Sequence, residues 1–156
     1  MNQLRRTFLK NTGTTGAVAV AIAAGLIKPT EVLAANWNKG AFEAKGMADA
    51  LKGMGVAAPS DSKDIAIKAP DIAENGSTVP VEVSSKIAGT QSISIMVEKN
   101  ATPLVAQFEL ANGAEPYVST RIKMGQTSLV RCVVVAGGKS FSATKEVKVT
   151  IGGCGG

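Results

Sequence analysis

Residues Tyr117-Val118-Ser119-Thr120-Arg121-Ile122-Lys123-Met124 alternate strictly between two kinds of side chain. Apolar or β-branched side chains occupy every second position from Val118, and polar or amphipathic ones stand between them. A period of two puts the two sets on opposite faces of a β-strand. The stretch therefore predicts a strand with one face in a core. The other face carries Tyr117, Arg121 and Lys123, for which we favour solvated surface over a partner interface.

The same period recurs along most of the chain. Further runs begin near Ile65, Val79, Ile93 and Leu104, span residues 127–135, and extend from Phe141 to Ile151. Turn-forming residues separate the runs, namely Glu74-Asn75-Gly76, Lys99-Asn100, Asn112-Gly113, Met124-Gly125 and Gly137-Gly138. Seven short strands with regular turns predict an antiparallel β-sandwich of immunoglobulin-like architecture. Because proline cannot donate to a strand ladder, Pro80 predicts an edge strand or a bulge.

A helical pattern precedes the strands. Apolar residues recur at spacings of four and three across residues 36–55, at Trp37, Ala41, Ala44, Ala48 and Leu51. Two glycines and Pro59 end the pattern. We expect a short N-terminal helix, with Trp37 and Phe42 packed against the main domain rather than binding a ligand.

The N-terminus has the features of an export signal. Arg5-Arg6-Thr7-Phe8-Leu9-Lys10 precedes a mild hydrophobic run from Gly16 to Ile27, and Val32-Leu33-Ala34-Ala35 follows. This order is typical of a cleaved signal peptide, and the paired arginines Arg5 and Arg6 indicate the twin-arginine route. The alternative, a membrane anchor, needs ~20 apolar residues, more than this run contains. We expect cleavage after Ala34 or Ala35 and export to the periplasm.

These patterns divide the chain into four parts. They are a signal peptide at 1–34, a helical segment at 35–58, a β-sandwich at 59–151 and a flexible carrier arm at 152–156. Because the twin-arginine route carries folded cargo and no cofactor motif is visible, we expect export with a partner protein.

The charged residues and the absence of histidine narrow the chemistry. The net charge is +5, but outside the first 34 residues 13 basic and 11 acidic residues are scattered, which argues against a nucleic-acid partner. The sequence has no histidine and two cysteines, which excludes a Ser-His-Asp triad, a Cys-His dyad, and zinc sites built from histidine or from cysteine alone.

Cys154 stands in a segment that has no other side chains. Its neighbours are Gly152, Gly153, Gly155 and Gly156. Such a segment predicts a mobile arm that holds its thiol roughly 10 Å beyond the last strand. A free cysteine has a pKa near 8.5, and nothing in the arm lowers it. Cys154 is therefore predicted to be a covalent attachment point that other enzymes act on, and the protein a carrier without catalytic residues or a metal.

Cys132 lies in a different setting. It shares parity with Val130 and Val134 inside a β-branched run, so we expect an inert core residue. A disulfide to Cys154 is the alternative in an oxidising compartment. A glycine arm tied down in this way would lose its reach, which disfavours that alternative.

The C-terminal stretch Val147-Lys148-Val149-Thr150-Ile151-Gly152-Gly153-Cys154-Gly155-Gly156 resembles that of the SoxY family of sulfur carriers. Further matches are Glu74-Asn75-Gly76 with Val79-Pro80-Val81, and Ser119-Thr120-Arg121-Ile122-Lys123. The resemblance covers essentially the whole chain and implies that Cys154 is the carrier cysteine on a swinging arm. Cys132 matches no motif of the family.

The resemblance also implies partners. A SoxZ-like subunit without its own signal would form a heterodimer with this chain. A c-type cytochrome complex would join thiosulfate oxidatively to the cysteine, and a manganese-dependent hydrolase would release sulfate. A molybdenum-containing sulfane dehydrogenase would oxidise the remaining sulfur in some organisms.

Two other functions remain open. Ubiquitin-like sulfur carriers also end in Gly-Gly, but their ATP-dependent activation and mixed fold fit an exported β-protein poorly. A periplasmic binding or assembly module would use Cys154 for intermolecular disulfides. Lipidation of the tail does not fit, since Cys154 lacks aliphatic followers.

Overall fold

The computed structural model describes residues 38–56, 58–111 and 113–150. Two helices come first, α3 (Lys39–Glu43) and α4 (Met47–Gly53). Nine strands follow in these described ranges: β1 (Ser60–Asp61), β2 (Ile65–Lys68), β3 (Ile72–Ala73), β4 (Val79–Ser85), β5 (Thr90–Val97), β6 (Leu104–Glu109), β7 (Tyr117–Ile122), β8 (Ser128–Ala136) and β9 (Lys139–Val149). Arg5, Arg6 and the arm at 152–156 lie outside the described residues.

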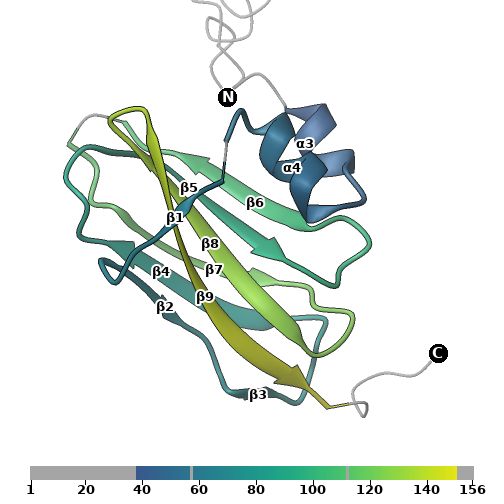
Figure 1. Cartoon of the computed structure of the whole chain (residues 1–156). Helices are drawn as coiled ribbons and strands as arrows, with labels where there is room; N and C mark the ends of the chain where they lie inside the picture. Colours follow the sequence, from purple (N-terminus) through teal and green to yellow (C-terminus); the bar gives the residue numbers. More distant parts are fainter. Residues whose placement is uncertain (1–37, 57, 112, 151–156) are drawn as a thin grey trace, which may run out of the picture. The chain divides into compact units, whose positions relative to one another are not determined.

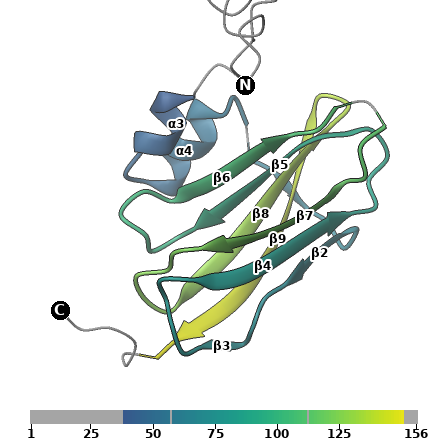
Figure 2. The same cartoon turned by 180° about the vertical axis from the view of Figure 1, so that it is seen from behind.

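The strands form two sheets that enclose one core (Figure 1). The larger sheet has the order β1-β9-β8-β5-β6, with β3 also paired to β9, and the smaller has the order β2-β4-β7 (Figure 2). Pairing is antiparallel except for β1 and β3, which each run parallel to β9. The predicted immunoglobulin-like sandwich is confirmed, and each of the seven predicted runs forms a strand.

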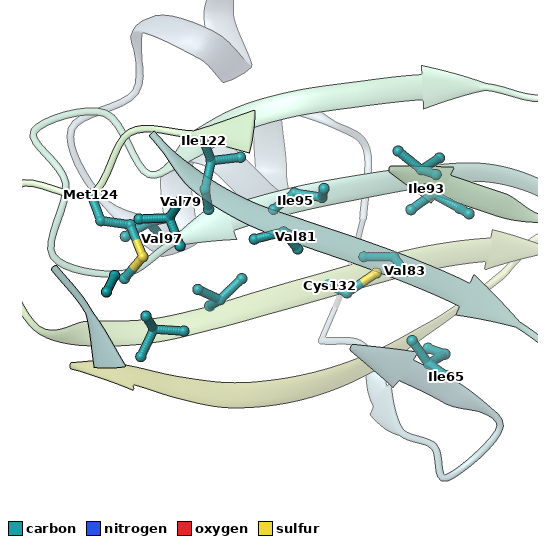
Figure 3. Packing of buried hydrophobic residues seen from close by; sticks show 14 of the residues in the cluster. Ile65, Val79, Val81, Val83, Ile93, Ile95, Val97, Ile122, Met124 and Cys132 are labelled. Atoms are coloured by element: carbon teal, nitrogen blue, oxygen red, sulfur yellow. The ribbon is translucent and has the colours of Figure 1, made fainter. Parts of the chain in front are cut away.

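The core consists of the alternate side chains that the sequence pattern selects. Every second residue of three central strands is fully buried, and together they form the middle of the main cluster (Figure 3): Val79, Val81 and Val83 from β4, Ile93, Ile95 and Val97 from β5, and Val130, Cys132 and Val134 from β8. Burying one such side chain stabilises the fold by roughly 1.5–3 kcal/mol. Met124, just after β7, closes this core at the end where β9 finishes.

The two helices cover part of the outer face of the larger sheet. Ala41 and Ala50 pack with Met96, Leu104 and Val133 in a second buried cluster. The helices therefore bury Val133 on the outer face of β8, while its neighbours Cys132 and Val134 are buried on the inner face. Phe42 packs against this cluster, as predicted, and Trp37 lies outside the described residues.

The expected single helix is instead two short ones. Gly46 is extended (φ −125°, ψ 152°), and Ala44 has left the helical region (ψ 137°). The break allows α3 and α4 to pack against each other so closely that a β-carbon on Gly53 would lie 2.8 Å from the backbone of Ala41. Ala48, which was predicted to lie in the apolar stripe, is exposed as a result.

Pro80 was predicted to mark an edge strand or a bulge. This prediction is wrong, because β4 is not an edge strand and has no bulge at Pro80. β4 is the central strand of the smaller sheet, and its register with β7 is regular at the Pro80–Arg121 pair. Pairing with β2 involves only Glu82–Ser85 of β4. Proline is tolerated because it lies beyond the end of β2.

Candidate functional site

Cys132 is sealed inside the sandwich. It lies opposite Ile95 of β5 and Ala143 of β9, and its side chain is 0% exposed. Burial raises the pKa of the Cys132 thiol from 9.0 to about 12, so the thiolate is a negligible fraction at neutral pH. Cys132 is a free thiol, as predicted for an inert core residue. Neither its exposure nor its ionisation suits it to carry a substrate.

Cys154 and its four glycines lie outside the described residues, but the strand that leads to them is well defined. β9 is the longest strand of the described part and runs from Lys139 to Val149. Near its end, β9 pairs in parallel with β3, at the Ile72–Lys148 and Ala73–Val149 pairs (Figure 1). We call Lys148–Thr150 the arm root, because these are the last described residues before the predicted arm.

The arm root is hydrogen-bonded along both edges. On the β3 edge, Lys148 N donates to Asp71 O at 3.0 Å and Thr150 N donates to Ala73 O at 3.1 Å. On the β8 edge, the hydroxyl of Thr127 accepts from Val149 N at 2.9 Å and donates to Val149 O at 3.4 Å. The fold therefore holds the chain firmly up to Thr150.

The loop after β3 contacts the arm root through Gly76, which lies against Val149. Asn75 Oδ1 accepts from Ser77 N at 2.8 Å, and Gly76 O accepts from Met124 N at 2.7 Å. Gly76 lies against Met124 and Val149 with no room for a side chain. In the sequence, Glu74-Asn75-Gly76 indicated a turn and matched the family. Its contact with the arm-bearing strand became visible only in the structure.

Comparison with known proteins identifies the family. The model of the family described as "Sulfur oxidation protein SoxY" matches residues 51–154, more than half of the chain. The chain belongs to the SoxY family. The match includes the whole described sandwich, the arm root and Cys154 itself.

A solved SoxY structure has a similar fold. The sulfur carrier protein SoxY from Chlorobium limicola f thiosulfatophilum is 45% identical over 67% of this chain and 96% of that chain, with a TM-score of 0.61. A superoxide reductase (neelaredoxin) from Ignicoccus hospitalis is less similar, at 19% identity over 60% of this chain and 83% of that chain, with a TM-score of 0.49. Comparison with curated proteins gave no match.

The remaining predicted surface of this SoxY protein agrees with the sequence pattern. Tyr117, Arg121 and Lys123 are exposed, and Tyr117 and Arg121 lie in the smaller sheet on its outer side, opposite the buried Val118 and Ile122. A shallow hollow of about 490 Å³ lies between the β4–β5 turn and a second segment that contributes Leu110, Ala111, Gly113, Ala114 and Pro116. None of the residues of the arm root lines it.

Proposed function

We propose that this SoxY-family protein is a periplasmic sulfur carrier that binds thiosulfate-derived groups covalently on Sγ of Cys154. The observation that carries the proposal is the burial of Cys132, which makes one of the two cysteines in the sequence unsuitable for attachment and so favours Cys154. The family match supports the same residue, since it extends to position 154. The carrier holds its cargo, and its partner enzymes supply the catalytic groups.

The loading step is an oxidation. The Cys154 thiol loses its proton, and Sγ bonds to the outer sulfur of thiosulfate. Two electrons pass to the partner oxidant, a c-type cytochrome complex. Water then cleaves the bond between that outer sulfur and the sulfonate group, in a manganese-dependent hydrolase. Sulfate leaves, and a persulfide stays on Cys154. A molybdenum-containing sulfane dehydrogenase, where one is present, oxidises this last sulfur.

Location and assembly complete the proposal. The paired arginines Arg5 and Arg6 support export by the twin-arginine route, with the signal cleaved after Ala34 or Ala35. A SoxZ-like subunit would be exported with the folded chain as a heterodimer. Within residues 38–56, 58–111 and 113–150, no helix has the length and apolar character needed to cross a membrane.

The test is intact-mass measurement of the mature protein, copurified with its partner subunit and incubated with thiosulfate and the cytochrome complex, in the absence of the hydrolase that removes sulfate. The native protein and Cys132→Ala should gain one thiosulfate unit per chain, and Cys154→Ser should gain none. Loading of Cys154→Ser would overturn the proposal. If the tail instead serves an assembly module, the only change will be a doubling of mass that a reductant reverses.

A further inference from the structure

Within the part of the chain that the structure describes, the side chain of Thr127, which directly precedes β8, is hydrogen-bonded to the arm root on its β8 side. The backbone ladder between β8 and β9 ends at the Ser128–Val147 pair. The residues before Ser128 leave the ladder and form a loop, in which Gly125 N donates to Asn100 Oδ1 at 3.1 Å. The Thr127 hydroxyl therefore takes the place of the next backbone partner and satisfies both polar groups of Val149.

The opposite edge alone is a weak attachment. β3 is only two residues long and pairs in parallel with β9. The ion pair between Lys145 Nζ and Asp71 Oδ1, at 3.0 Å, supports it, but the Asp71 side chain is 89% exposed. Because exposed ion pairs contribute little, loss of the Thr127 hydrogen bonds should loosen the arm root even though its two backbone hydrogen bonds to Asp71 and Ala73 remain.

From these contacts we infer that Thr127 is a positioning residue for the carrier arm. Its hydroxyl holds Val149 in place, so that the chain is bound to the fold up to Thr150. This limits the length of free chain between the fold and the thiol of Cys154. This inference rests on the proposed function, since it concerns the delivery of cargo from Cys154. It does not depend on which sulfur compound is carried.

The expected effect follows from chain length. If the chain is held up to Thr150, the free chain up to and including Cys154 has four residues, which allows a reach of at most about 14 Å. If the arm root detaches as far as Val147, seven residues are free and the limit rises to about 25 Å. The effective concentration of the thiol near the fold then falls about two-fold, because it scales with roughly the −3/2 power of chain length.

Amide hydrogen exchange on the full mature chain tests the clamp directly. Thr127→Val removes the hydroxyl and keeps the shape, Thr127→Ala removes it without adding volume, and Thr127→Ser keeps the hydroxyl. In both variants without a hydroxyl, Val149 and Thr150 should exchange about five- to ten-fold faster, while core amides such as that of Val134 stay protected. Thr127→Ser should exchange like the native protein. Unchanged protection of Val149 and Thr150 in Thr127→Ala would overturn the inference.

A nitroxide label on Cys154 measures the consequence for the arm. Because Cys132 is buried, the reagent should attach only to Cys154 in the folded protein. Relaxation enhancement at amides of the 98–101 and 123–126 loops should fall about two-fold in Thr127→Ala and stay native in Thr127→Ser. An unchanged pattern in Thr127→Ala contradicts the inference. If Cys154 resists the label, the proposed carrier function fails instead, and hydrogen exchange still decides the role of Thr127.

Discussion

Gly76 lies against Val149 so closely that no larger residue fits. A β-carbon on Gly76 would lie 2.8 Å from Cγ1 of Val149 and would overlap the carbonyl oxygen of Met124. The loop that follows β3 thus touches the strand that leads to Cys154, and glycine makes this contact possible.

We therefore expect Gly76→Ala to destabilise the fold by about 1–3 kcal/mol, since the backbone must shift to relieve the overlap. Gly125→Ala is the matched control in a neighbouring loop, because a β-carbon there would meet only Asn100 Oδ1, at 3.9 Å. Urea unfolding of both variants measures the difference. If Gly76→Ala and Gly125→Ala had the same free energy of unfolding, the loop at Gly76 would accommodate a β-carbon without loss of stability, and the prediction would be wrong.

Cys132→Ala should cost about 1 kcal/mol of unfolding free energy at pH 7 and leave loading of Cys154 unchanged. The physical reason is that Cys132 fills part of the core between β5 and β9 but takes no part in the chemistry. Urea unfolding and intact-mass loading assays on the same preparation check both statements. Loss of loading in a stable Cys132→Ala protein would assign Cys132 a role in function.

High pH should remove the advantage of Cys132 over alanine. Because burial raises the pKa of the folded thiol to about 12 from 9.0, the unfolded chain ionises first as the pH rises. The stabilising contribution is complete below pH 9 and is lost as the pH rises toward 12, by about 1.4 kcal/mol per pH unit. Native protein and Cys132→Ala should therefore reach equal stability near pH 10. A constant difference from pH 7 to pH 10.5 would contradict the burial of a protonated thiol.

Export can be tested separately from folding. Replacing Arg5 and Arg6 together by lysine should retain the protein in the cytoplasm and leave the mature fold untouched, since both residues precede the sandwich. Cell fractionation followed by immunodetection measures this. Unchanged periplasmic accumulation of the double variant would rule out the twin-arginine route.

The strands were predictable because most have one face in the core and the other in water. Val79, Val81 and Val83 alternate with more exposed neighbours, so the period of two is visible in the sequence. The same logic placed Cys132 in the core, where it lies. Local alternation is sufficient for both conclusions.

Other features depend on contacts between distant segments. The break at Gly46 separates two helices whose residues Ala41 and Ala50 are both buried in a cluster with Met96 and Leu104, far away in sequence. Likewise, Pro80 is tolerated in a central strand because β2 is short, which the sequence around Pro80 does not indicate.

The hydrogen bonds and contacts of the arm root could not be predicted from the local sequence pattern either. Thr127 stands in a strand-like run and gave no sign that its hydroxyl would bond Val149, which lies 22 residues away in sequence. Glu74-Asn75-Gly76 was identified as a turn and a family match, but its partner strand was not. Pairwise tertiary contacts of this kind are absent from a periodicity analysis.

The most direct test of the carrier role is peptide mapping of the thiosulfate-loaded native protein. The protein is digested under acidic, non-reducing conditions, and the peptides that contain Cys132 and Cys154 are fragmented in a mass spectrometer. We predict that the added sulfur and sulfonate lie on Cys154 and that Cys132 remains an unmodified thiol. An adduct on Cys132, or a disulfide joining Cys132 to Cys154, would contradict the account.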